Sequence, residues 1–180
     1  SNSTLKVSSR SNPNGNKAWR DFTQIKGRIT ERDVVEFISD NISSMDARDA
    51  TTLIHAVAKN KIKLGDTTMV ASIELLQQNQ QMKVDMFYLT KCFQGLRCFR
   101  TKTNDCAIVE SYLAHLQRII QNNSSSITLD GQSVGQCLYA LQRISTKQRG
   151  LSSLLSTLTP KIAETDEMLS GQEIGNALYG

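Results

Sequence analysis

The stretch Leu129–Tyr139, LDGQSVGQCLY, recurs 40 residues later as Leu169–Tyr179, LSGQEIGNALY. Six of the eleven positions are identical, and the other five keep their polar or apolar character. Within each copy the apolar residues follow the i, i+3, i+4 spacing of one helix face. A helix that recurs at a near-constant interval is typical of helical-repeat proteins, in which each unit buries its apolar face against the next.

The same apolar frame occurs twice more toward the N-terminus. Leu89, Cys92 and Phe93 precede Val134, Cys137 and Leu138 by 45 residues, and Leu53, Ala56 and Val57 precede Leu89, Cys92 and Phe93 by 36. We therefore expect an all-α chain without a sheet, built as a right-handed α-solenoid of tandem helical hairpins with a repeat of 36–45 residues.

The expected organisation is a short leader followed by one array. Residues 1–18 are expected to form a flexible, polar and basic leader, and residues 19–180 a single α-solenoid. The units are expected to start near residues 19, 46, 83 and 128, with an incomplete last unit from residue 169.

Local signals place the helix boundaries and one packing feature. Thr30 and Asp33 form a capping-box pattern ahead of an apolar helix, and Asp46 or Asp49 begins the next one. Gly135 and Gly175 occupy equivalent positions inside their helices, where glycine costs about 1 kcal/mol relative to alanine. We expect close helix-to-helix approach to offset that cost; room for a ligand against the backbone is the alternative.

The charge balance is close to neutral outside the leader. Residues 1–30 hold six Lys/Arg against one Asp, whereas residues 31–180 hold 15 Lys/Arg against 16 Asp/Glu. A basic binding surface must therefore come from local clustering and not from net charge. No apolar run is long enough to span a membrane, and the polar N-terminus does not resemble a secretory signal.

The sequence carries no pattern typical of an enzyme or a metal site. Phosphate-loop, nucleophile-elbow and metalloprotease motifs are absent, and the four cysteines include no C-x-x-C pair. We expect no catalytic residue, no metal, no cofactor and no small-molecule substrate. Cys92, Cys98, Cys106 and Cys137 are interpreted as small buried apolar side chains.

Two positions around the first apolar residue of each unit are polar or amphipathic in every unit but differ in identity. A solenoid that reads one RNA base per repeat needs this arrangement of constant scaffold and variable hydrogen-bonding side chains, although an ordinary solvated helix face varies in the same way. The candidate base-reading residues are Thr52, His55, Tyr88, Lys91, Ser133, Gln136 and Asn176.

Basic residues gather after the first helix of each unit. Three such clusters at corresponding places would line one edge of the stack and hold a phosphate backbone. The alternative is that these cations complement the dipoles of helix C-termini. The candidate phosphate-binding residues are Lys59, Lys61, Lys63, Arg97, Arg100, Lys102, Arg143, Lys147 and Arg149.

The segment Phe22–Asn60 resembles the opening repeat of organellar helical-repeat RNA-binding proteins, the RAP-domain, FAST-kinase-domain and octotricopeptide-like proteins. The matching places are Ile25, Thr30, the apolar helix from Val34 to Ile42, and Asp49–Lys59, DATTLIHAVAK. Gly175–Gly180, GNALYG, is similar to repeats of such proteins from algae and other protists. A RAP module is not visible in this chain, so its catalytic role is not carried over.

The resemblance implies binding of single-stranded RNA in a mitochondrion or plastid, in support of transcript stability, processing, translation or ribosome assembly. The alternative is a protein-binding α-solenoid, either a scaffold or a subunit of a larger organellar complex. The near-neutral charge of residues 31–180 suits that alternative at least as well.

Overall fold

Every regular element of the described chain is a helix. The computed structural model describes residues 28–77, 84–99, 106–142 and 144–179, without the side chains of residues 176, 177 and 179. The all-α expectation is confirmed for these residues. The leader and the unit start near residue 19 lie outside them. The helices are α2 (Glu31–Asn41), α3 (Ala47–Lys59), α4 (Asp66–Gln77), α5 (Met86–Gly95), α6 (Ala107–Asn122), α7 (Gly131–Leu141), α8 (Arg149–Ala163) and α9 (Gly171–Tyr179), with 3-10 turns η1 (Ile42–Ser44) and η2 (Leu96–Cys98).

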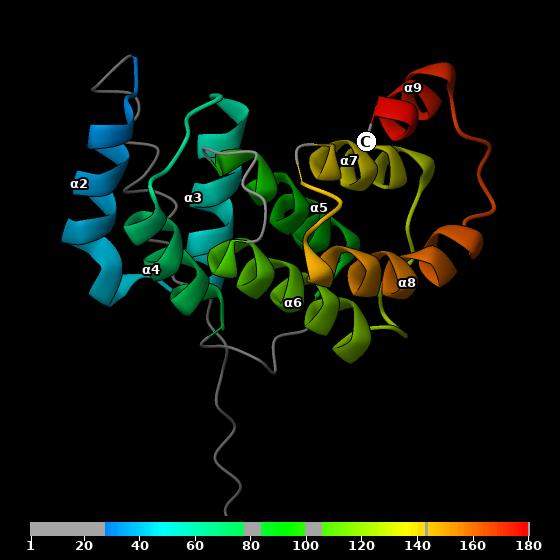
Figure 1. Ribbon diagram of the computed structural model, residues 1–180, viewed down its shortest axis with the longest axis horizontal. Helices are drawn as coiled ribbons and strands as arrows, with labels where there is room; N and C mark the ends of the chain where they lie inside the picture. The colour runs from blue at the N-terminus through cyan, green and yellow to red at the C-terminus, as the bar shows by residue number, and fades with distance from the viewer. Residues whose placement is uncertain (1–27, 78–83, 100–105, 143, 180) are drawn as a thin grey trace, which may run out of the picture.

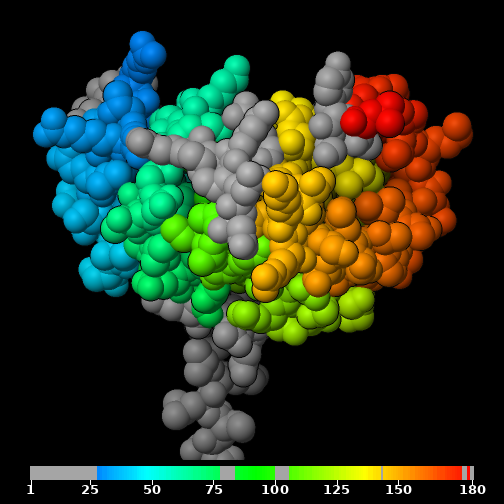
Figure 2. Space-filling view, in the orientation of Figure 1, coloured from blue at the N-terminus to red at the C-terminus, as the bar shows by residue number. Residues whose placement is uncertain are grey.

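Alternate helices pack against each other in two rows. In the first row, α3 contacts α5, α5 contacts α7 and α7 contacts α9; in the second row, α4 contacts α6 and α6 contacts α8. Figure 1 shows the second row in front of the first. Across the rows, α3 packs against α4 and α5 packs against α6. The elements follow one another in chain order from α2 at one side of the molecule to α9 at the other (Figure 2).

An aspartate starts each of three first-row helices. Asp46 accepts a hydrogen bond from the backbone N–H three residues on (2.9 Å), and Asp85 and Asp130 do the same at 2.8 and 2.7 Å. Such an N-cap satisfies one of the four N–H groups that a helix start leaves without an intrahelical partner. The expected capping box of Thr30 and Asp33 is present at the start of α2.

Glutamates join helices that are one unit apart. Glu31 accepts a 2.9 Å hydrogen bond from the N–H of Gly65, just before α4, and Glu110 of α6 accepts one of 2.7 Å from Gly150 in α8. Glu167, which precedes α9, accepts one of 3.1 Å from Gly131 at the start of α7. Each carboxylate lies at the positive end of a neighbouring helix, which fixes the position of that helix relative to its neighbour.

The core runs through both rows without interruption. Tyr112 of α6 is fully buried, and its hydroxyl donates a 2.7 Å hydrogen bond to the carbonyl of Cys92 in α5. Its ring meets Phe99 edge to face at a centroid distance of 5.7 Å. This contact therefore joins the two rows through a satisfied buried polar group. No helix within the described ranges is long and apolar enough to cross a membrane.

Close approach at glycine is confirmed at one of the two expected positions. A Cβ added at Gly135 of α7 would lie 3.2 Å from the Cα of Glu173 in α9, so the two helices are in close contact there. A Cβ added at Gly175 of α9 would meet no atom of the described chain within 4 Å. The two equivalent glycines therefore differ: Gly135 allows α7 and α9 to pack closely, whereas Gly175 faces open space.

The tightest glycine contact predicts a stability difference. A Cβ added at Gly95 would overlap the Tyr112 hydroxyl and lie 2.7 Å from Cγ2 of Ile54. We expect Gly95→Ala to lower the free energy of unfolding by about 1–3 kcal/mol, because the buried tyrosine has no room to move. In the control Gly175→Ala, the open site should give a rise of up to about 1 kcal/mol from helix propensity. Urea denaturation measures both, and equal effects of the two changes would contradict the packing described.

A buried histidine makes stability depend on pH. His115 of α6 is 6% exposed, and its Nε2 has no hydrogen-bond partner among the described residues. Burial, and then the positive charge of Arg118, lower the pKa of His115 from 6.5 to about 4. Between these two values the unfolded chain binds a proton that the folded chain does not, so stability is complete above pH 6.5 and falls as the pH drops toward 4.

We expect the free energy of unfolding to fall by about 2 kcal/mol from pH 7 to pH 5 through His115 alone. Urea denaturation at the two pH values, on the wild type and on His115→Leu, measures this contribution as the difference between the two falls. His55 and the other titrating groups contribute equally to both proteins. A fall of the same size in both would show that His115 is protonated as readily in the folded chain as in the unfolded one.

Candidate functional site

The positions of the capping aspartates give a different alignment of the units from the one predicted by the apolar residues. Asp46, Asp85 and Asp130 hold the same N-cap position, which gives offsets of 85 − 46 = 39 and 130 − 85 = 45 residues. The expected offset of 36 between the first two units, which paired Leu53 with Leu89, is therefore wrong by three residues, about one helical turn. Leu89 corresponds to Ala50 instead.

The corrected alignment changes which side chains correspond. Thr52, Lys91 and Gln136 share one position, the sixth after each capping aspartate, and all three are half-buried. His55 lies one turn further along α3, so it does not belong with Lys91 and Gln136 as expected. Its counterparts are Gln94 and Tyr139, nine residues after their capping aspartates.

Two of the expected base-reading residues are buried between helices. Tyr88 and Ser133 are 8% and 7% exposed. Both stand three residues after the capping aspartate, and in α5 this position faces the preceding first-row helix, because the Tyr88 hydroxyl donates a 3.4 Å hydrogen bond to the carbonyl of Ala47 in α3. Burial raises the pKa of Tyr88 well above its usual value. The expectation that these two side chains lie on an open surface is therefore wrong.

A hollow of about 280 Å³ lies across α3, α5 and α7. Arg97 donates a 3.0 Å hydrogen bond to Oε1 of Gln94, whose Nε2 donates a 3.1 Å bond to the carbonyl of Gln136. The guanidinium carbon of Arg97 lies 5.1 Å from the ring centroid of Tyr139, a cation–π contact. The hollow is lined by His55, Lys59, Gln94, Arg97, Gln136 and Tyr139.

A second hollow, of about 300 Å³, shares Arg97 and Tyr139 with the first. This second hollow lies where the α3–α4 connection runs beside η2. Two hydrogen bonds hold the connection there: the N–H of Leu64 donates to the carbonyl of Cys98 (2.9 Å), and Nζ of Lys63 donates to the carbonyl of Arg97. The second hollow is lined by Ala58, Lys61, Lys63, Arg97, Tyr139 and Gln142. We call the two adjoining hollows the Arg97 groove.

The electrostatic environment of the groove is positive. The pKa of His55 is lowered first by burial and then by the positive charges of Lys91, Lys59 and Arg97. Among the described residues, no carboxylate lines either hollow. Arg97 is held by a neutral amide and an aromatic ring, and no described carboxylate pairs with it. Its charge therefore remains available to an anion.

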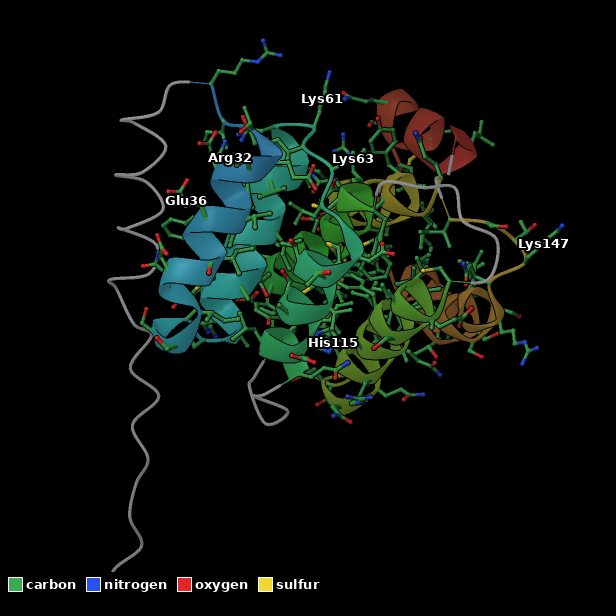
Figure 3. All side chains as sticks on the ribbon, turned by 60° about the vertical axis from the view of Figure 1, so that its left-hand side comes forward. Arg32, Glu36, Lys61, Lys63, His115 and Lys147 are labelled. Carbon is green, nitrogen blue, oxygen red and sulfur yellow. The ribbon has the colours of Figure 1, made fainter. Side chains whose placement is uncertain are left out.

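The remaining predicted residues lie elsewhere or outside the description. Lys147 and Arg149 are exposed and line neither hollow, and Figure 3 shows Lys147 well apart from Lys61 and Lys63. Arg149 is the first residue of α8, so it cannot complement the dipole of a helix C-terminus. Arg100, Lys102 and Arg143 fall outside the described residues, as does the side chain of Asn176.

Four groove residues were not predicted from the sequence, namely Ala58, Gln94, Tyr139 and Gln142. The apolar frame alone could not identify them. The regular spacing of Asp46, Asp85 and Asp130 was visible in the sequence and would have placed Gln94 and Tyr139 beside His55.

Three of the four cysteines are buried as expected, whereas Cys106 is only partly buried. Cys92, Cys98 and Cys137 are buried, and burial raises the pKa of each thiol to about 12, which keeps it protonated. Over the described ranges, no three His, Cys, Asp or Glu side chains gather in a way that could hold a metal ion.

Known proteins give no further guidance on identity. Comparison with protein-family models, with curated proteins and with solved structures finds no match to this chain. The resemblance to organellar helical-repeat RNA-binding proteins therefore stays a prediction.

Proposed function

We propose that this chain is an α-solenoid that binds single-stranded RNA along the outward faces of α3, α5 and α7. The two rows of alternating helices support the solenoid, because each row gains one helix per unit and every helix packs on the one before it in its row. The Arg97 groove crosses three first-row helices, so a bound strand would contact several units at once.

The chemistry of the Arg97 groove is the observation that carries this proposal. Lys59, Lys61 and Arg97 offer positive charge to phosphates, and the described lining residues include no carboxylate that would compete for it. His55, Gln136 and Gln142 offer hydrogen-bonding groups that suit base edges. The Tyr139 ring and the Arg97 guanidinium offer planar surfaces for stacking, which single-stranded RNA uses because its bases are exposed.

Binding of another protein is the second candidate, and exposed apolar side chains at and beside α9 favour it. Met168 is 96% exposed, Leu178 82% and Ile174 46%. Exposed apolar surface of this kind is typical of protein contacts. We prefer RNA for the Arg97 groove, since the apolar side chains at α9 do not line it. A role in a mitochondrion or plastid rests on the resemblance alone and remains a prediction.

Charge reversal near His55 tests the RNA proposal. We expect Lys59→Glu with Lys91→Glu to weaken the binding of a 15-nucleotide single-stranded RNA by at least about tenfold, because Lys59 lines the groove and the charge of Lys91, which lines neither hollow, still acts on His55 inside it. The slope of log affinity against log salt should become shallower by roughly 1.4, at about 0.7 per lost phosphate contact. Fluorescence anisotropy over a salt series measures both quantities.

The control makes the same change in charge outside the groove. Lys147→Glu with Arg149→Glu should leave both the affinity and the salt slope near those of the wild type, because these residues line neither hollow and are not among the charges that act on His55. Thermal unfolding of both double variants checks that each remains folded. Equal RNA binding by the groove variant and the wild type, or no measurable RNA binding by the wild type at low salt, would contradict the proposal.

A further inference from the structure

Lys61 has a backbone conformation that lysine rarely adopts. Its φ is 58°, and it is the one non-glycine residue with positive φ in the described part of the chain. The N–H of Lys61 bonds to the carbonyl of Ala58 (3.0 Å), and the N–H of Ile62 bonds to that of Val57 (3.1 Å). This pair of hydrogen bonds is the Schellman motif that ends α3, and Lys61 occupies its left-handed position.

Glycine is the residue that this position favours. The left-handed conformation brings Cβ of any other residue close to the backbone, and a non-glycine residue held there reduces the stability of the fold. The hydrogen bonds that close α3 come from backbone groups and would form equally well with glycine. Local structure therefore does not explain why a lysine stands here.

The position of the Lys61 side chain supplies an explanation. It extends outward from the α3–α4 connection (Figure 3), is exposed, and lines the 300 Å³ hollow together with Lys63 and Arg97. Lys63 donates to the carbonyl of Arg97, which holds these two residues beside each other across two units. The other lining residues, Ala58, Tyr139 and Gln142, are neutral. Lys61 and Arg97 thus bring two positive charges to one hollow, beside the bound amino group of Lys63, and no carboxylate of the described residues lines it.

We propose that this hollow binds a phosphate group and that Lys61 is one of its ligands, so that the strain at Lys61 is retained for binding. The inference rests on the proposed function for one of two sources of the phosphate, the backbone of an RNA strand. The other source is a free phosphate monoester, such as a mononucleotide. Arg97 provides a planar fork of N–H donors suited to phosphate oxygens, and Lys61 provides a compact positive charge.

The test uses substitutions that keep or relieve the backbone conformation. Lys61→Gly and Lys61→Asn both suit left-handed backbone and remove the charge, whereas Lys61→Arg keeps the charge and the strain. The probes are adenosine 5′-monophosphate, followed by calorimetry, and a five-nucleotide RNA without a terminal phosphate, followed by anisotropy. Lys147→Gly is the control for the loss of an exposed lysine outside the hollow.

The expected result has two parts. Lys61→Gly should raise the urea midpoint of unfolding while weakening at least one probe fivefold or more, and Lys61→Asn should weaken the same probe by a similar factor. Lys61→Arg and Lys147→Gly should bind within twofold of the wild type. If the Lys61 variants bind the pentanucleotide more weakly, the phosphate belongs to the RNA backbone. If they lose affinity only for the mononucleotide, the hollow binds a free phosphate monoester.

The phosphate site and RNA binding can be lost independently, and the two probes tell these results apart. Unchanged binding of both probes by Lys61→Gly and Lys61→Asn overturns the phosphate site, and RNA binding by the wild type would still support the proposed function. Binding of the mononucleotide that depends on Lys61, with no RNA binding, supports the site and removes the proposed function. Absence of binding of either probe to the wild type overturns both.

Discussion

The hydrogen bond that the third backbone N–H of a helix donates to an aspartate carboxylate fixes the start of each described first-row helix from α3 to α7. Asp46, Asp85 and Asp130 make this bond at 2.7–2.9 Å. Because side-chain direction follows position along a helix, the start of the helix decides which residues face the neighbouring helices and which face outward. The burial of Tyr88 and the exposure of the Arg97 groove both depend on that start.

Contacts between connections determine how one unit lies against the next. The hydrogen bond from Leu64 to Cys98 places the end of one first-row helix beside the end of the following one. Lys61 and Arg97 are 36 residues apart in the sequence, yet they line the same hollow as a result. The glutamate contacts at Gly65 and Gly150 hold the starts of second-row helices in the same way. The groove therefore belongs to the stacking of units and to no single helix.

The sequence predicted the elements of this fold better than their register. The i, i+3, i+4 pattern identified the first-row helices α3, α5, α7 and α9, because apolar residues at that spacing lie on one face. The same pattern looks almost unchanged when it is shifted by three residues, so it paired Leu53 with Leu89 and placed His55 one turn away from its true counterparts. The adjacency of Lys61 and Arg97 depends on contacts between connections, which have no periodic signal. The left-handed backbone of Lys61 was likewise not predictable, since lysine does not favour it.

The acids of this chain explain how a nearly neutral body can present a basic groove. Asp46, Asp85 and Asp130 are bound to helix N-termini, and Glu110 and Glu167 are bound to backbone N–H groups of neighbouring helices. These carboxylates are thus hydrogen-bonded to backbone N–H groups at sites away from the hollows, and they do not neutralise the charge of Lys59 or Arg97. The charge of residues 31–180 sums to about zero, but several of its acids lie at helix starts while part of its positive charge meets at one groove. Net charge is therefore a poor guide to what this surface binds, because the same residues that stabilise the helices separate the two signs in space.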